Sequence, residues 1–393
     1  MTVASGVTAG TRWASRAQFF ASGFIFATWG VHVPTVKAHY AIDEAQLGLA
    51  MLAAGAGAMV GLTSAGRWIG RHGPRRMAAL CGCIYALLIA GLIAMPGYAA
   101  LLGLLAVFGL VTSVFDVAIN TEAAQLELRG GQPLMSGMHG MFSLGGMVGA
   151  ASGSAALAAG MAAQTHLWTV ATVMIALVAI ASTRMLPTPA APADGAAASD
   201  RGFRLPRGVL AVLGVLAALG LIAEGAIYDW SVLYMQQELG SPQQQAALAY
   251  ASFSAAMAAA RFGGDAMRAR FSPTALLRGS GVLAAVAMTL VLLTDLPWLA
   301  LLGFAGVGVG FANVVPILFG ASARVPGVAP ANGIAAVSAI AYLGFMAGPA
   351  VIGLLARVSS LTAALYVVVA FAAALAASAR FTGSGDSAAG KEE

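Results

Sequence analysis

The candidates for chemistry in this 393-residue chain are polar side chains that stand inside long apolar runs. Asp116 and Asn120 are four residues apart in one such run, and this spacing places both side chains on one face of an α-helix. A charged residue at the centre of a membrane-spanning helix costs about 2.5–3.5 kcal/mol even on the mild scales, so its presence indicates function. We expect Asp116 to carry a proton or to bind a polar solute, with Asn120 offering both a donor and an acceptor. The alternative for both residues is a purely structural hydrogen bond to a neighbouring helix.

A second group of polar residues lies in the other half of the sequence. Glu224 and Tyr228 share a helix face, whereas Asp229 is turned away by about 140° and is expected to anchor its helix at the membrane interface. Glu224 is therefore the second candidate for coupling or binding, with Tyr228 beside it, against the alternative of a structural role. Further polar contacts to a solute are expected from Asn313, Asn332 and Tyr342.

Three further polar positions indicate gating or structural contacts. His139 precedes Ser143 by four residues, so it is either a buried neutral histidine bonded to that hydroxyl or a histidine that titrates at a gate. Arg261 and Asp265 are also four residues apart, which predicts an ion pair on a helix surface that steadies a gate. His32, at the far end of the first apolar run, is expected at the membrane interface.

The composition excludes an ordinary soluble protein. Hydrophobic residues make up 60% of the chain and charged residues 9%, whereas soluble domains carry about a quarter charged residues. The 49 glycines suit closely packed membrane helices, so we interpret the runs around Gly57, Gly61 and Gly308 as helix contacts rather than nucleotide-binding loops. The two cysteines, Cys81 and Cys83, lie inside an apolar run, so neither a disulfide framework nor a metal site is expected.

Apolar runs separated by charged, proline-containing and polar clusters predict an all-α membrane protein with twelve transmembrane helices. These helices are expected near residues 17–34, 46–66, 77–95, 98–126, 136–160, 166–186, 208–235, 246–267, 274–293, 298–320, 330–355 and 361–379. All of the 20 lysines and arginines except Lys37 and Arg357 fall on one side of this arrangement. Because cytoplasmic loops are rich in these residues, the sequence predicts that both termini are cytoplasmic.

A stretch rich in proline and alanine divides the twelve predicted helices into six and six. The expected parts are a first bundle at 1–186, a cytoplasmic linker at 187–207, a second bundle at 208–380 and a cytoplasmic tail at 381–393. Two short sequences recur at one offset: Leu144–Gly149 corresponds to Leu343–Gly348, and Arg71–Pro74 to Arg270–Pro273. Two pseudo-symmetric six-helix bundles around a site at the midplane are the plan of a transporter that works by alternating access.

The basic loop between the second and third predicted helices runs from Gly66 to Arg76. With twelve spans and a central linker, it resembles the signature loop of the major facilitator superfamily, although the usual acidic position is Gly70 here. Its candidate gating residues are Arg67, Arg71, Gly73 and Arg75. Two segments, Asp116–Gly146 and Glu224–Ser231, look like the branch of that superfamily that contains the membrane protein MosC.

This resemblance implies a secondary active transporter that works by a rocker-switch motion, and carboxylates in both halves favour proton coupling. A sugar-, polyol- or inositol-like solute is expected, in part from the MosC-like branch. The alternatives are proton antiport of drugs or amphipathic metabolites and, from another class, a membrane sensor that does not transport. Because hydrolase and metalloprotease motifs are missing, we expect no enzymatic activity. We expect a monomer in the inner (plasma) membrane that binds a small solute and protons, without cofactor, metal or nucleic acid.

Overall fold

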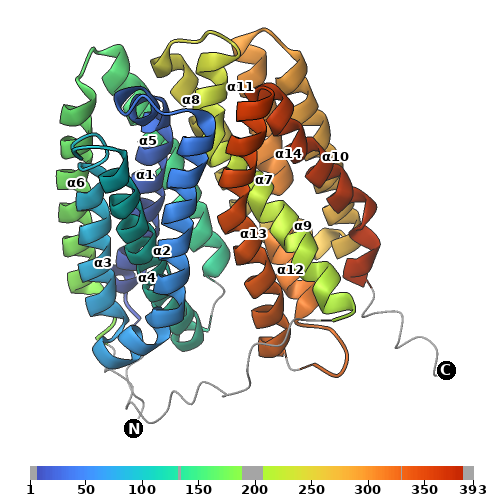
Figure 1. Cartoon of the computed structure of the whole chain (residues 1–393). Coiled ribbons are helices and arrows are strands. Elements are labelled where there is room, and N and C mark those ends of the chain that lie inside the picture. The colour runs from blue at the N-terminus through green and yellow to red at the C-terminus, as the bar shows by residue number, and fades with distance from the viewer. Residues whose placement is uncertain (1–6, 132–133, 188–206, 329, 384–393) are drawn as a thin grey trace. The chain divides into compact units, whose positions relative to one another are not determined.

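The computed structural model describes residues 7–131, 134–187, 207–328 and 330–383. Within these ranges every regular element is helical (Figure 1). A chain embedded in lipid must satisfy its backbone N–H and C=O groups internally, and a helix does so within each apolar run. The predicted all-α class is therefore confirmed.

The helices coincide with the twelve predicted spans. In the first half they are α1 (Ala9–His39), α2 (Glu44–His72), α3 (Pro74–Ile89), α4 (Tyr98–Gly130), α5 (Met135–Ala158) and α6 (Ala163–Arg184). In the second half they are α7 (Val209–Gln237), α8 (Gln243–Phe262), α9 (Gly264–Arg270), α10 (Pro273–Leu293), α11 (Pro297–Phe311), α12 (Val314–Ser322), α13 (Pro330–Val358) and α14 (Leu361–Ala377). Two predicted spans are each divided in two, because a break separates α8 from α9 and another separates α11 from α12.

Several helices begin where the sequence supplies a cap. The Ser272 side chain accepts a hydrogen bond from the backbone N–H of Ala275, and Pro273 occupies the first turn of α10. The Ser360 side chain accepts in the same way from the N–H of Ala363 at the start of α14. Both caps satisfy backbone donors that a helix cannot satisfy within its first turn.

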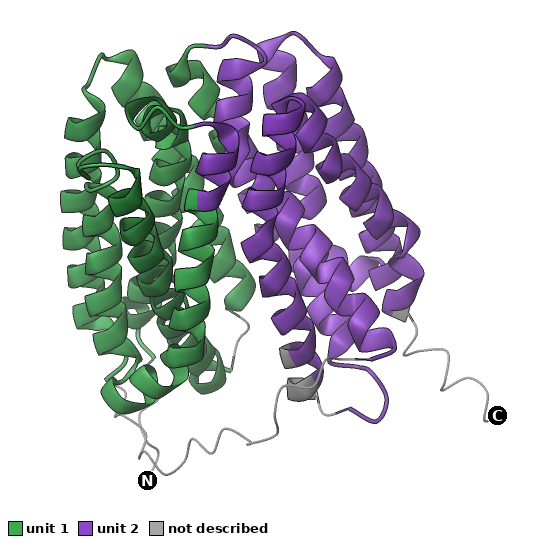
Figure 2. Cartoon of the chain, viewed as in Figure 1, with its two compact units in different colours: residues 1–42, 50–200, 242–251 green, residues 43–49, 201–241, 252–393 purple. Residues whose placement is uncertain are grey.

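The chain forms two compact units, shown in different colours in Figure 2. Unit 1 comprises residues 1–42, 50–200 and 242–251, and unit 2 comprises residues 43–49, 201–241 and 252–393. Unit 1 therefore includes the start of α8, and unit 2 includes the start of α2.

Each unit repeats one packing scheme. In unit 1, α1 packs on α5 and α6, while α3 packs on α4 and α6. In unit 2, α7 packs on α13 and α14, while α10 packs on α11 and α14 (Figure 1). The helices that correspond in the order of predicted spans therefore make the same contacts, as expected of pseudo-symmetric six-helix bundles.

Glycines bring helices of unit 1 into close contact. A Cβ atom placed on Gly57 of α2 would lie 1.7 Å from the carbonyl oxygen of Ala106 in α4, and one placed on Gly109 would lie 1.8 Å from that of Ala54. Such distances are possible only without a side chain, so the two backbones touch directly. The interpretation of Gly57 as a helix contact is confirmed.

Replacing Gly57 by alanine is expected to lower the free energy of unfolding by about 1–3 kcal/mol, because a methyl group added to a filled contact forces the helices apart. Gly66 lies on the same helix and has no atom within 4 Å of a Cβ placed on it. Gly66→Ala is therefore the matched control, with a neutral or slightly stabilising effect expected from the helix preference of alanine. Thermal unfolding in detergent compares the two variants, and equal losses would contradict the close contact.

Candidate functional site

Asp116 and Asn120 lie on one face of α4, as their spacing predicts, and both are half-buried. The Asn120 side-chain amide donates hydrogen bonds to the Asp116 backbone oxygen at 2.9 Å and to its Oδ1 at 3.1 Å. In the part of the chain that the structure describes, no lysine or arginine forms an ion pair with Asp116. A neutral amide thus steadies a carboxylate that has no cationic partner there, an arrangement that suits reversible protonation.

The surroundings of Asp116 include a tyrosine that the sequence interpretation missed. Tyr85 of α3 is fully buried, and its ring packs against Phe108 at 4.8 Å and Phe115 at 6.3 Å between centroids. The Tyr85 hydroxyl lies near Thr112, one helical turn before Asp116, and near enough to Asp116 to be affected by the charge of its carboxylate. A tyrosine inside an apolar run carries no spacing signal, so only the packing of α3 on α4 places it here.

Two further carboxylates of α4 hold the chain at helix ends. Glu127 Oε2 accepts from the N–H groups of Leu134, at 2.7 Å, and Met135, at 3.1 Å, and so caps the start of α5. Glu122 is fully buried, and its Oε1 accepts from the N–H of Leu186 at 2.7 Å, just beyond the end of α6. Both residues thus hold backbone N–H groups next to a helix end, although Glu122 Oε2 has no hydrogen-bond partner among the described residues. Asp116 differs from both, because its side chain is bonded by the Asn120 amide.

The basic loop joins α2 to α3 by a sharp turn at Gly73. This residue has φ 81° and precedes Pro74, the first residue of α3. A side chain is strained at such a φ, which explains the glycine. Arg67 and Arg71 are exposed, whereas Arg75 is half-buried. The positive charge of Arg75 also acts on the buried Glu122 of α4.

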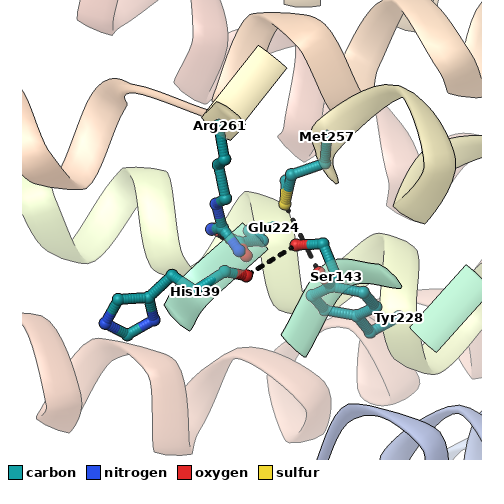
Figure 3. Close-up of polar contacts among 6 residues, drawn as sticks. All are labelled: His139, Ser143, Glu224, Tyr228, Met257 and Arg261. Carbon is teal, nitrogen blue, oxygen red and sulfur yellow. Dashed lines mark hydrogen bonds and ion pairs between the residues drawn. The ribbon is translucent and has the colours of Figure 1, made fainter. Parts of the chain in front are cut away.

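Glu224 and Arg261 form an ion pair in unit 2 (Figure 3). The Arg261 Nη2 atom donates to Glu224 Oε1 at 3.0 Å, and the two side chains are 14% and 10% exposed. The sequence predicted Asp265 as the partner of Arg261; the Asp265 side chain lies outside the described residues, so that pair stays a prediction beside the observed contact with Glu224. Two opposite charges in neighbouring apolar runs are the signal that would have indicated this pair.

The Tyr228 side chain, which was predicted beside Glu224, contacts α8. Its hydroxyl donates to the Met257 sulfur at 3.4 Å, as Figure 3 shows, and its ring meets Phe253 edge-on at 5.0 Å between centroids. Asp229 is also buried, at 6% exposure. The face of α7 that packs against α8 therefore carries both an ion pair and an aromatic contact.

Asn313 lies at the break between α11 and α12 and is 5% exposed. Its Oδ1 is 2.6 Å from a Cβ placed on Gly264, so the amide packs against the start of α9, three residues after Arg261. This contact brings Asn313 to the segment that carries the ion pair. Of the other predicted residues of the second half, Tyr342 is 40% exposed on α13, and the Asn332 side chain lies outside the described residues.

His139 differs from one of its two predicted environments, the buried one, because its side chain is exposed. The Ser143 hydroxyl donates to the backbone oxygen of His139 at 3.3 Å (Figure 3). The ring meets Phe19 of α1 edge-on at 5.5 Å between centroids. The expectation of a buried histidine is therefore wrong. The bond from Ser143 to the carbonyl one turn earlier is a common contact of a serine within a helix.

Comparisons with known proteins agree with this architecture. The sequence model described as Major Facilitator Superfamily matches residues 17–334. An uncharacterised MFS-type transporter of Yersinia pestis is 35% identical over 367 residues, which cover 93% of this chain and 94% of that protein. The membrane protein MosC of Rhizobium meliloti is 30% identical over 367 residues, covering 93% of this chain and 88% of MosC.

Solved structures share the fold at lower sequence identity. The xylose transporter XylE from E. coli, in an inward-open conformation, superposes with a TM-score of 0.73 at 14% identity, covering 95% of each chain. The nucleoside transporter NupG, as its D323A mutant, gives a TM-score of 0.72 at 14% identity, covering 94% of this chain and 99% of NupG. At these identities the likeness establishes the fold alone.

Proposed function

Because the chain belongs to the major facilitator superfamily, we propose that it moves a small polar solute across the membrane and that protons drive this movement. Members of the family are multi-pass membrane transporters and not enzymes, and this chain is one of them. The single observation that carries the proposal of proton coupling is the state of Asp116. Its carboxylate is bonded by the amide of Asn120 and has no ion pair among the described residues.

Two carboxylates of the apolar helices have different surroundings, and this difference supports different roles for them. Glu224 is paired with Arg261, so its charge is compensated and it has little reason to take up a proton. Asp116 has only a neutral partner, and an uncompensated charge in an apolar helix is relieved when the carboxylate binds a proton. Alternating exposure of Asp116 to the two sides of the membrane would couple its protonation to transport.

Neutral polar groups support the proposed class of solute. Asn120 in unit 1 and Asn313 in unit 2 each offer a donor and an acceptor, which suit the hydroxyl groups of sugars, polyols or inositols. The solved structures of like fold include a D-xylose–proton symporter and a nucleoside transporter, which is consistent with a solute of this kind. The mechanism that we propose is a rocker-switch movement of two six-helix bundles, one at 1–186 and one at 208–380, in a monomer.

We further propose that the termini, the linker at 187–207 and the tail at 381–393 face the cytoplasm across the inner membrane. All lysines and arginines except Lys37 and Arg357 would then lie on the cytoplasmic side. In this orientation the basic loop with Arg67, Arg71 and Gly73 also faces the cytoplasm. The helices would be surrounded by lipid, and the proposed transport involves no nucleic acid.

A proton-flux experiment tests this function. The purified protein is first screened by thermal unfolding against sugars, inositols, amino-polyols and cationic amphiphiles, because a ligand at about 100 times its Kd adds roughly 2.7 kcal/mol of stability. A stabilising solute is then added to proteoliposomes that contain a pH-sensitive dye. We expect the solute to carry protons inward, and protein-free liposomes to show no change.

Each other outcome has a definite meaning. Transport of the solute without any change of internal pH would overturn proton coupling and leave the polar solute standing. Stabilisation by amphiphiles alone, together with proton movement opposite to theirs, would replace the proposal by drug or metabolite antiport. A solute that stabilises the protein but is not transported would favour a sensor.

A further inference from the structure

Tyr85 has a buried hydroxyl that its packing does not require. The side chain belongs to α3 and is 0% exposed. Its hydroxyl oxygen has no hydrogen-bond partner among the described residues. A phenylalanine would fill the same place beside Phe108 and Phe115 without leaving a buried polar group unbonded, which costs free energy. Such a group in a folded protein indicates a role other than packing.

The Tyr85 ring is held against one face of α4. Its centroid lies 4.8 Å from that of Phe108 and 6.3 Å from that of Phe115. Gly82, about one turn earlier on α3, leaves room for the Phe115 ring, because a Cβ placed on Gly82 would lie 2.7 Å from Phe115 Cε2. These contacts hold the phenol in place, with its hydroxyl near Thr112.

The Asp116 carboxylate lies on the same side of α4 as this hydroxyl. Side chains of a helix lean towards its N-terminus, so the Asp116 side chain lies over the turn that begins at Thr112. Asn120 shows this geometry one turn later, where its amide reaches back to Asp116 Oδ1 at 3.1 Å. Among the described residues Asp116 Oδ2 forms no hydrogen bond, so this oxygen is the one to which Tyr85 would donate.

Thr112 offers the tyrosine a second acceptor. The Thr112 hydroxyl donates its hydrogen to the backbone oxygen of Phe108 at 2.7 Å, so its own oxygen can still accept. A phenol has a single hydrogen to donate, which can therefore go to Thr112 or to Asp116. An ionised carboxylate is the stronger acceptor of the two, and it loses this advantage when it binds a proton.

Other charged and titratable groups come from the helices around Asp116. The helices α1, α3 and α5 pack on α4, and α2 meets it at Gly57 and Gly61. Three of the groups nearest to the middle of these helices are exposed, namely Arg16 on α1, Arg67 on α2 and His139 on α5.

The less exposed groups have other contacts or carry no charge. His32 of α1 is bonded to α6, and Glu122 of α4 to the segment just beyond α6. On α3, Cys83 contacts a carbonyl oxygen of α6, and Cys81 is a buried thiol, which is uncharged at neutral pH. Among the described residues none of these groups is bonded to the carboxylate of α4 that Asn120 holds, so the tyrosine is the titratable donor left near it.

We propose that Tyr85 is a positioning residue for the proton at Asp116. Its hydroxyl donates to the carboxylate when Asp116 is ionised and to Thr112 when Asp116 carries a proton. The Tyr85 hydrogen stays on its own oxygen in both states, and only the proton of Asp116 is exchanged with water. The tyrosine stabilises the ionised form and so sets the pH at which Asp116 releases its proton.

The inference rests on the proposed function in one respect, which is that Asp116 exchanges a proton. It needs neither a particular solute nor a direction of transport. All of the residues involved belong to unit 1, so it is also independent of any movement of one unit against the other.

Infrared difference spectroscopy of the full-length protein in lipid, between about pH 4 and about pH 9, tests this role. The signal of a protonated carboxyl group that is lost in Asp116→Asn gives the midpoint of the Asp116 titration. In Tyr85→Phe, which keeps the ring, we expect this midpoint to rise by about one to two pH units. A hydrogen bond to a charged group stabilises that group by about this amount.

Tyr234→Phe is the matched control. Tyr234 is also buried, at 1% exposure, but it lies in unit 2 and its hydroxyl donates to the backbone oxygen of Val291 at 3.0 Å. The same chemical change there is expected to leave the midpoint of Asp116 unchanged. An equal rise in both variants would contradict a specific contact of Tyr85 with Asp116.

Two results in Tyr85→Phe would overturn the proposal. An unchanged midpoint would mean that the tyrosine only packs, and a lower midpoint would mean that its oxygen accepts from the protonated form. The wild-type spectrum gives a second test that does not depend on whether a variant folds. Tyrosine signals should change together with the carboxyl signal, and a carboxyl signal without any tyrosine signal would also overturn the proposal.

The proposed function and this inference can fail separately. If the midpoint rises in Tyr85→Phe but proteoliposomes show no proton movement, proton coupling is wrong and the role of Tyr85 stands. If proton-coupled transport is found but the midpoint stays the same in Tyr85→Phe, the role of Tyr85 is wrong and proton coupling stands. A carboxyl signal that is missing over the whole pH range would overturn both.

Discussion

Replacing Asp116 by asparagine is expected to abolish the accumulation of solute against its gradient. With one coupled proton, a pH difference of about one unit supports about tenfold accumulation, because one pH unit corresponds to about 1.36 kcal/mol. Asparagine keeps the size of the side chain but cannot bind a proton, so the ratio of internal to external solute should fall to about one. Uptake by proteoliposomes with an imposed pH gradient measures this ratio, and counterflow of labelled solute without a gradient should persist.

Asp295→Asn is the matched control for this experiment. Asp295 is exposed in the loop before α11, so the same chemical change there should leave accumulation intact. If Asp116→Asn still accumulated solute about tenfold under the same gradient, Asp116 would not be the proton carrier. Loss of both accumulation and counterflow would indicate instead that Asp116 binds the solute.

Neutralising one member of the Glu224–Arg261 ion pair is expected to destabilise the protein more than neutralising both. The two side chains are 10% and 14% exposed, so Glu224→Gln leaves an uncompensated arginine and Arg261→Gln an uncompensated glutamate. Breaking a buried ion pair from one side costs about 3–5 kcal/mol, whereas removing both charges is often nearly neutral. Unfolding of the two single variants and of the double variant in detergent gives the coupling free energy between these side chains.

The ion pair between Asp43 and Arg357 is the control within the same unit. Its atoms lie 3.4 Å apart, but the Arg357 and Asp43 side chains are 60% and 39% exposed. An exposed pair contributes about 0–1 kcal/mol, so Asp43→Asn should cost far less than Glu224→Gln. Equal costs for the two variants, or additive losses in the Glu224–Arg261 double variant, would contradict a buried and coupled pair.

Contacts within one helix were predictable because they depend only on the spacing of residues in the sequence. Asp116 and Asn120 meet as their spacing requires, since four residues make about one turn of helix. The twelve spans were predictable for a similar reason, because lipid requires long apolar helices and charge marks where they end. The role of the glycines at Gly57 and Gly308 also followed, because small residues in a membrane helix indicate close packing.

Contacts between helices could not be predicted from any one apolar segment, because they depend on how two helices pack. The sequence did not indicate that the side chain of Arg261 reaches Glu224 on another helix. His32 Nε2 and His166 Nδ1 lie 2.9 Å apart although 134 residues separate them in the sequence, and Tyr85 approaches Asp116 only because α3 packs on α4. The sequence by itself thus determined which residues are costly in an apolar environment, because that cost belongs to each residue and its own helix. Only the tertiary structure decided which of them compensate one another, because compensation requires two side chains within hydrogen-bonding distance, and that distance is set by how the helices pack.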